Sequence, residues 1–119
     1  MTPSQTIVSE STRTLTTVDT NGRRLSLRRL TALDTLRLFK IAGPLLAQNE
    51  PWLAMAGLAF SVLEIDGVPV PASVTEAQIE GLVGRLGDTG LTAIANVIND
   101  EYAATESRAD VGNLPGTLS

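Results

Sequence analysis

The stretch from Pro51 to Leu63 is the feature that most constrains the fold of this chain. These thirteen residues carry no charge and lie between two glutamates. A helix that is apolar on both sides is a buried one, so we expect the other elements to pack around this stretch. The run is shorter than the roughly 20 residues that a membrane span needs, which indicates a core helix. Its apolar residues fall on two helical stripes: Leu53, Ala56, Gly57 and Phe60, and Met55, Leu58, Ala59 and Val62.

Small residues within this run leave room for a close helical neighbour. That neighbour is either the last helix of this chain, a second copy or a partner protein, and the residues leave all three open. The small residues are Ala54, Ala56, Gly57 and Ala59.

Composition points to one small helical domain. A chain of 119 residues fits a single domain, and 3% aromatic residues mean a core of Leu, Val, Ile and Ala, which favours helices packed on helices. Residues 1–12 are rich in Ser and Thr, lack the pattern of a signal peptide and predict a flexible arm. The domain is expected over residues 13–104, followed by a flexible polar tail over residues 105–119.

The expected fold is mainly α with an N-terminal β-hairpin, in the α+β class. Asn21-Gly22 predicts a type I′ turn, which places Asp19 opposite Arg24. This register gives the hairpin one apolar face and one basic face that carries Arg24 and Arg28. Leu15 then falls on the wrong face, so a bulge or a slip of the register is an open alternative.

About four helices are expected to pack around the central apolar one. Thr31 and Asn49 predict helix caps, and Gly43-Pro44 and Gly87 predict helix ends. A third cap is either Ser73 with Glu76 or Thr75 with Gln78. Asp66-Gly67 predicts a very short second hairpin within residues 63–70, whose prolines confine it to a sheet edge. The helices are expected over residues 32–42, 51–63, 75–86, and from 88 or 89 to about 102.

The charge of the chain is divided unevenly. Residues 1–40 hold seven basic and three acidic groups, a balance of +4, whereas residues 41–119 hold two basic and ten acidic groups, a balance of −8. One half is therefore expected to dock electrostatically on the other, or on a second copy, with Arg24 and Arg28 as the docking residues. Because these arginines have no aromatic companions and the chain is acidic, nucleic acid is only a minor alternative.

The chain is poorly supplied for catalysis. It has no His, no Cys and a single lysine, Lys40, so a Ser–His relay and thiolate chemistry are impossible. Its carboxylates do not have the spacing of a metal cage. Asp88-Thr89-Gly90 matches the D-T-G of aspartic proteases, but it lies between two helical stripes, where a helix cap explains it. We expect no enzyme activity, no metal and no cofactor.

Several segments together resemble small tail assembly chaperones of long-tailed bacteriophages and prophages. The resemblance covers about residues 14–100, most of the folded part, and the segments that carry it are Asp19–Lys40, the helix at 51–63, Glu64–Pro71 and Glu76–Asn96. The resemblance implies a non-enzymatic protein, often multimeric, that binds the helical tape measure protein and helps recruit tail-tube protein around it. It also implies a place in the host bacterial cytoplasm and absence from the mature virion.

A chaperone of this kind would hold a client helix in an apolar groove. The candidate lining residues are Leu36, Phe39, Leu53, Phe60, Ile94 and Ile98, although each is also a candidate for ordinary core. Two rival functions remain open. One is a structural tail or connector subunit that stays in the virion. The other is a small regulatory protein that binds a host protein or nucleic acid through the Arg-rich hairpin.

Overall fold

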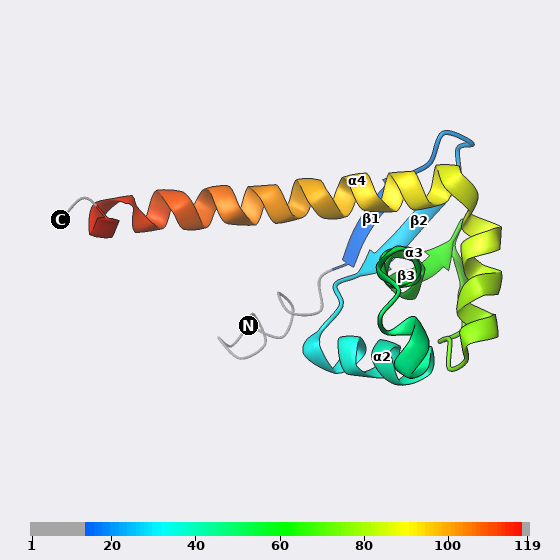
Figure 1. Cartoon of the computed structure of the whole chain (residues 1–119). Coiled ribbons are helices and arrows are strands. Elements are labelled where there is room, and N and C mark those ends of the chain that lie inside the picture. Colours follow the sequence, from blue (N-terminus) through cyan, green and yellow to red (C-terminus); the bar gives the residue numbers. More distant parts are fainter. Residues whose placement is uncertain (1–13, 118–119) are drawn as a thin grey trace, which may run out of the picture.

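The fold consists of an antiparallel sheet with helices packed against it, which confirms the α+β class. The computed structural model describes the backbone of residues 14–117 and the side chains of residues 14–104. Within this range there are four strands, in the order β1-β2-β3-β4, and three helices (Figure 1). The elements are β1 (Thr14–Val18), β2 (Arg24–Arg28), α2 (Ala32–Leu46), α3 (Glu50–Phe60), β3 (Val62–Ile65), β4 (Val68–Pro69) and α4 (Glu76–Thr117).

The first hairpin forms as expected, but its register is shifted by one residue. Leu15 lies opposite Leu27, and Asp19 pairs with Arg23 through a backbone hydrogen bond of 3.0 Å. The prediction that Asp19 faces Arg24 is therefore wrong, and the slip left open for Leu15 is the observed arrangement. The cause is the Asp19 carboxylate, whose Oδ1 accepts hydrogen bonds of 2.9 Å from the backbone N–H groups of Asn21 and Arg23. These bonds fix a three-residue loop in which Gly22 has a φ of 84°.

The short second hairpin is confirmed. Asp66 and Gly67 both have positive φ, 52° and 79°, as a type I′ turn requires. β4 pairs only with β3 and lies at the edge of the sheet, where the missing N–H of Pro69 costs no ladder bond.

The expected count of four helices is wrong, because the last two form one helical element. α4 includes Gly87, whose φ of 63° and ψ of −174° are not helical, so the predicted helix end lies at this residue and two helical segments meet there in a kink. The helix expected over residues 51–63 ends at Phe60, because Val62 already belongs to β3. α2 ends at Leu46 and includes Gly43, whose φ of 77° and ψ of 174° are also not helical, so two helical segments meet at this predicted helix end as well.

The predicted caps are observed. Thr31 and Asp34 form a reciprocal capping box at the start of α2, and Asn49 Oδ1 accepts a 3.0 Å hydrogen bond from the Trp52 backbone. Of the two alternatives for the third cap, the observed one is Thr75 with Gln78, whose backbone N–H donates to Thr75 Oγ1 at 3.2 Å. Local sequence chemistry therefore determines where the helices begin.

The main core lies between the sheet and α4 rather than around α3. Leu25 and Leu27 of β2 are fully buried, and they pack against side chains on both sides of the α4 kink. α3 lies in the middle of the molecule in Figure 1, but of its residues only Ala56 and Ala59 are buried, so the expectation of a wholly buried central helix is wrong. The buried cluster is Leu25, Leu27, Ala59, Val62, Ile65, Leu82, Leu86 and Ile94.

The domain division stays a prediction. The arm predicted at residues 1–12 lies outside the described residues, and the tail predicted at residues 105–119 falls on the last turns of α4, whose backbone is helical to Thr117. Figure 1 shows this end of α4 extending well past the sheet and the other helices. None of the helices described here has both the length and the apolar character needed to cross a membrane.

The kink at Gly87 yields a first prediction. Its backbone conformation is one that residues with a Cβ rarely adopt, while an added Cβ would meet no atom within 4 Å. We expect Gly87→Ala to lower the free energy of unfolding by about 1–3 kcal/mol, through backbone strain alone. Gly84→Ala is the matched control, because Gly84 lies in the same helix with equally open space and should gain about 0.5–1 kcal/mol. Urea unfolding followed by circular dichroism measures both, and equal effects of the two variants would contradict the assignment.

Candidate functional site

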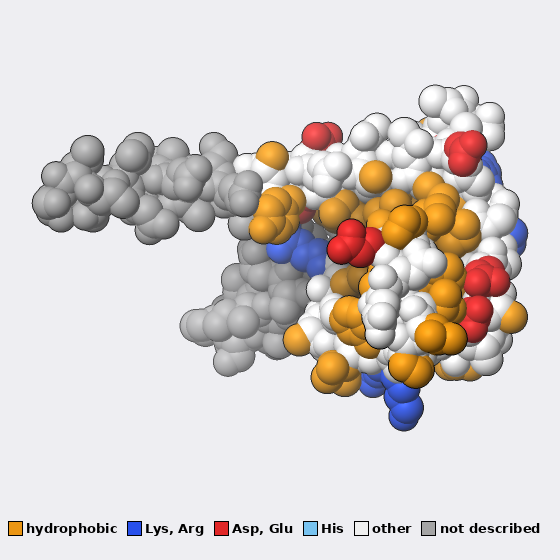
Figure 2. Space-filling model, viewed as in Figure 1, with side chains coloured by type: hydrophobic (Ala, Val, Ile, Leu, Met, Phe, Trp, Pro, Cys, Tyr) orange, Lys and Arg blue, Asp and Glu red, His pale blue; other side chains and the backbone are white. Residues whose placement is uncertain are grey.

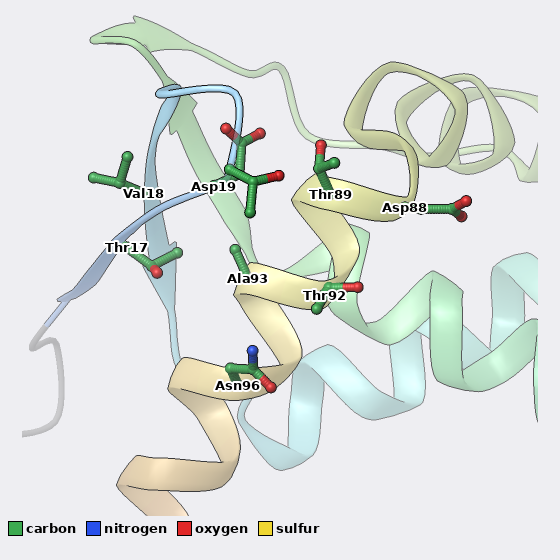
Figure 3. Close-up of a pocket in the computed structure, with 9 residues that line it drawn as sticks. Thr17, Val18, Asp19, Asp88, Thr89, Thr92, Ala93 and Asn96 are labelled. Carbon is green, nitrogen blue, oxygen red and sulfur yellow. The ribbon is translucent and has the colours of Figure 1, made fainter.

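Two hollows flank the first hairpin where it meets α4. The smaller one, with a volume of about 340 Å³, lies between the hairpin loop and the part of α4 that follows the kink (Figure 3). Most of its lining side chains are polar. They belong to Thr17, Val18, Asp19, Thr20, Asp88, Thr89, Thr92, Ala93 and Asn96.

Two charged groups beside this smaller hollow, Asp19 and Arg23, are used in structural contacts. Arg23 donates from Nε to Asp19 Oδ2 at 2.8 Å, and from its two terminal nitrogens to the backbone carbonyls of Arg85 and Leu86 at 2.8 and 2.7 Å. Burial raises the pKa of the Asp19 carboxyl, but hydrogen bonds from Arg23 and Asn21 outweigh this effect and leave the pKa below its usual value. Asp19 is therefore a carboxylate that holds the loop and the helix together.

The Asp88-Thr89-Gly90 triplet shows no protease geometry. It lies in α4 directly after the kink, and Figure 3 shows the Asp88 side chain pointing away from Asp19, so the two carboxylates do not face each other. Thr89 Oγ1 accepts a 3.2 Å hydrogen bond from Asn21, and a Cβ at Gly90 would lie 3.0 Å from Leu86 Cβ. The triplet thus brings the hairpin and α4 close together. Within the side chains that the structure describes, no group of three or more potential ligands is placed to hold a metal ion.

The larger hollow, which we name the apolar groove, has a volume of about 610 Å³ and lies between α3, α4 and the open end of the first hairpin. Figure 2 shows hydrophobic side chains around α3 and beneath α4, with basic side chains next to them on the left of this face. The lining residues are Leu15, Arg28, Arg29, Leu30, Leu53, Ala54, Gly57, Leu58, Ser61, Ile98, Glu101 and Tyr102.

The α3 side of the groove combines two small residues, Ala54 and Gly57, with two leucines, Leu53 and Leu58. Ala54 is exposed, and a Cβ added at Gly57 would meet no atom within 4 Å, so the helix backbone itself is accessible there. Leu53 and Ile98 are half-buried apolar walls, and Tyr102 is 66% exposed at the rim. An incoming apolar side chain can therefore contact hydrophobic surface that the chain itself leaves uncovered.

The basic rim of the groove is held by internal contacts. Arg28 forms an ion pair with Asp34 at 2.6 Å, donates to the Phe60 carbonyl at 3.1 Å, and lies 5.3 Å from the centre of the Phe60 ring. Arg29 forms an ion pair with Glu101 across the mouth of the groove. The Arg28 guanidinium hydrogen-bonded to Asp34 lowers the pKa of that carboxyl to about 2, although burial opposes the shift.

The structure brings three of the candidate site residues together. Leu53, Ile98 and Arg28 all line the apolar groove. Arg24 does not: its side chain is exposed, and its backbone N–H donates to Asp66 Oδ1 at 2.8 Å.

The other candidate partner residues lie elsewhere. Leu36 and Phe39 are on the exposed side of α2, where Leu36 is 67% exposed. Ile94 is fully buried in the main core, so a partner cannot contact it without unfolding. Phe60 is half-buried and packs against a second cluster that contains Leu38 and Ala56.

Some groove residues were not found by sequence reasoning. Leu15 was assigned to the wrong face because the hairpin register was off by one, and Leu30 carried no signal. Tyr102 had a usable signal, since it follows Ile98 by one helical turn. Ala54 and Gly57, expected to leave room for a neighbour, do line the groove, whereas Ala56 and Ala59 are buried.

The Arg28–Asp34 pair gives a second prediction. A folded-state pKa of about 2 against an unfolded value of 3.8 means that this contribution to stability is complete above about pH 4 and is lost as the pH falls towards 2. We expect Asp34→Asn to cost about 1 kcal/mol at pH 7, after discounting for solvent screening, and to flatten the loss of stability between pH 4 and 2. Asp100→Asn, at an exposed position, is the control. An unchanged acid limb in Asp34→Asn, measured by thermal unfolding, would exclude this role.

Comparison with known proteins does not assign a function to either hollow. Compared with protein-family models, with curated proteins and with solved structures, the chain shows no match. The likeness of its segments to tail assembly chaperones therefore stays a prediction, and function has to follow from the residues of the apolar groove.

Proposed function

We propose that this chain is a non-enzymatic phage tail assembly chaperone that binds apolar helices of a tape measure protein in its apolar groove. The observation that carries the proposal is the groove itself, with Ala54 and Gly57 on its α3 side, the half-buried Leu53 and Ile98 as walls and the exposed Tyr102 at its rim. In the cell the chain would act in the host cytoplasm, help recruit tail-tube protein and be absent from the mature virion.

The dimensions of the groove suit side chains projecting from a helix. A volume of about 610 Å³ falls within the range of roughly 300–1,000 Å³ that ligand sites in proteins occupy. It admits a few apolar side chains of one helix face, which is the mode of helix-in-groove recognition. Because only part of the partner is enclosed, such a grip is replaceable, as an assembly factor requires.

A second apolar surface lies on α2. Leu33, Leu36 and Phe39 follow one another at helical spacing of three residues and are all exposed. Exposed apolar surface at this spacing is typical of a face that meets another protein. It gives a long helical client, or another subunit of the assembly, a second place to bind.

The engagement of the charged groups also favours binding over catalysis. Asp19 and Asp34 are both held by arginine partners and have lowered pKa values, so neither is poised to exchange protons near neutral pH. The accessible surface of the apolar groove is instead mainly apolar.

Filling the groove tests the proposal. Gly57→Leu places a side chain into the groove at a helical position with free space, so the fold should be retained and client binding lost. We expect the affinity for a tape measure fragment to fall about 30-fold, which corresponds to about 2 kcal/mol, the scale of an interface hot spot. Gly84→Leu is the matched control, because Gly84 is also helical and a Cβ added there also meets no atom within 4 Å, but it is exposed and lies outside the groove. Isothermal titration calorimetry gives the affinities.

Co-expression provides the functional readout. When the two are produced together, this chain should keep the tape measure protein soluble, while its Gly57→Leu variant should not. Failure of the native chain to do so, together with a monomeric state in solution, would contradict the proposal. Detection of the chain in mature particles by mass spectrometry would favour the rival assignment as a structural tail or connector subunit.

A further inference from the structure

We propose that the exposed face of α2 binds a second copy of this chain, on the first part of that copy's α4. The two surfaces carry opposite charges and complementary shapes, and they lie on different sides of one molecule. The proposal concerns contacts between copies and does not rest on the proposed function. The α2 face consists of Leu33, Leu36, Arg37, Phe39 and Lys40, and the α4 face consists of Glu76, Ala77, Glu80 and Gly81.

The α2 face carries a row of large apolar side chains that the chain itself does not cover. Leu33, Leu36 and Phe39 are all exposed, and none of them belongs to either buried cluster of the fold. Their spacing of three residues places them next to one another along the helix, on the side away from the buried Leu38. An exposed row of this kind indicates a surface that another protein covers.

The charge on the α2 face has one sign only. Arg37 and Lys40 are exposed, and neither forms an ion pair with any side chain that the structure describes. The single acidic residue of α2, Asp34, is buried and already paired with Arg28. Pairing α2 with the α2 of another copy would bring like charges together, so the surface that fits is an acidic one.

The first part of α4 provides an acidic surface. Glu76 and Glu80 are exposed and one helical turn apart, and among the described side chains neither has a cationic partner. Trp52 Nε1 donates a 2.9 Å hydrogen bond to Glu80 Oε2 and holds this carboxylate in place. Because the indole is neutral, the charge of Glu80 stays available to a cation.

The shapes of the two faces also match. Ala77 and Gly81 are exposed, and a Cβ added at Gly81 would meet no atom within 4 Å, so the surface beside the carboxylates is shallow. A ridge of leucine and phenylalanine side chains packs into a shallow helix surface of this kind. In both helices the charged residues lie along one side of the uncharged ones, so apolar contacts and ion pairs can form at the same time.

The two faces meet only between different copies. Figure 1 shows α2 at the bottom of the molecule and the first part of α4 on its right. Figure 2 shows basic side chains at the lower edge and acidic ones along the right. The α2 face of one copy therefore binds the α4 face of the next. Such a head-to-tail contact leaves a free face at each end, so association continues into longer chains or closes into a ring.

Sedimentation equilibrium with charge-reversed variants tests this contact. We expect the mean mass of the native chain to rise with concentration, and the rise to shrink at about 0.5 M NaCl, because salt screens the ion pairs. Arg37→Glu with Lys40→Glu should stay monomeric, and so should Glu76→Lys with Glu80→Lys, since both faces then carry the same sign. An equal mixture of the two variants should associate again, because each face then meets its opposite.

Three further variants serve as controls. Arg24→Glu and Asp100→Lys reverse exposed charges outside both faces and should associate like the native chain. Leu36→Ser leaves every charge in place and should weaken the association about 10-fold, through lost apolar contact alone. Circular dichroism reports whether each variant is folded, and Leu36→Ser decides the question if a charge-reversed chain does not fold.

Three results would overturn the proposal. They are a native chain that stays monomeric at the highest concentration measured, association that persists in either folded charge-reversed variant, and a mixture of the two folded variants that stays monomeric. The assay contains no tape measure protein, so none of these results bears on client binding. Failure of the native chain to bind a tape measure fragment would, in turn, refute the proposed function and leave the contact between copies supported.

Discussion

The packing of the first hairpin against α4 depends on the guanidinium group of Arg23. It connects the loop of the first hairpin, through Asp19, to the backbone carbonyls of Arg85 and Leu86, more than 60 residues away. Carbonyls at the end of a helical segment lack helical partners and carry partial negative charge, so an arginine satisfies them well. Because Gly87 follows directly, the chain can turn at that point and continue as the second part of α4.

The direction of α4 after this turn determines both the core and the apolar groove. Because Gly90 has no side chain, the side chains of Leu86 and Arg23 can lie close to its backbone. One turn later, Ile94 is fully buried in the main core together with Leu25 and Leu27. One turn further on, Ile98 has passed the last large core residue and meets α3, where Gly57 offers no side chain to fill the space. The groove is thus the place where the core runs out while α4 continues.

Local chemistry made much of the fold predictable from the sequence. The caps at Thr31 and Asn49 and the turn at Asp66-Gly67 depend on neighbouring residues only, and all were predicted correctly. The register of the first hairpin was not, because it depends on how the Asp19 carboxylate bonds within its loop, and a slip of one residue exchanges the two faces. Ile94 and Ile98 share one helical stripe, yet only the three-dimensional position of the sheet makes one of them core and the other groove wall.

The uneven charge of the two parts of the chain does not simply bring the basic part onto the acidic part in the structure. The pairs Arg23–Asp19 and Arg28–Asp34 lie within the basic part of the chain, whereas Arg29–Glu101 joins the basic and acidic parts. Arg28, expected to dock a partner, instead connects β2 to the start of α2 and the end of α3. These contacts hold the groove rim in place, so recognition there depends on apolar shape.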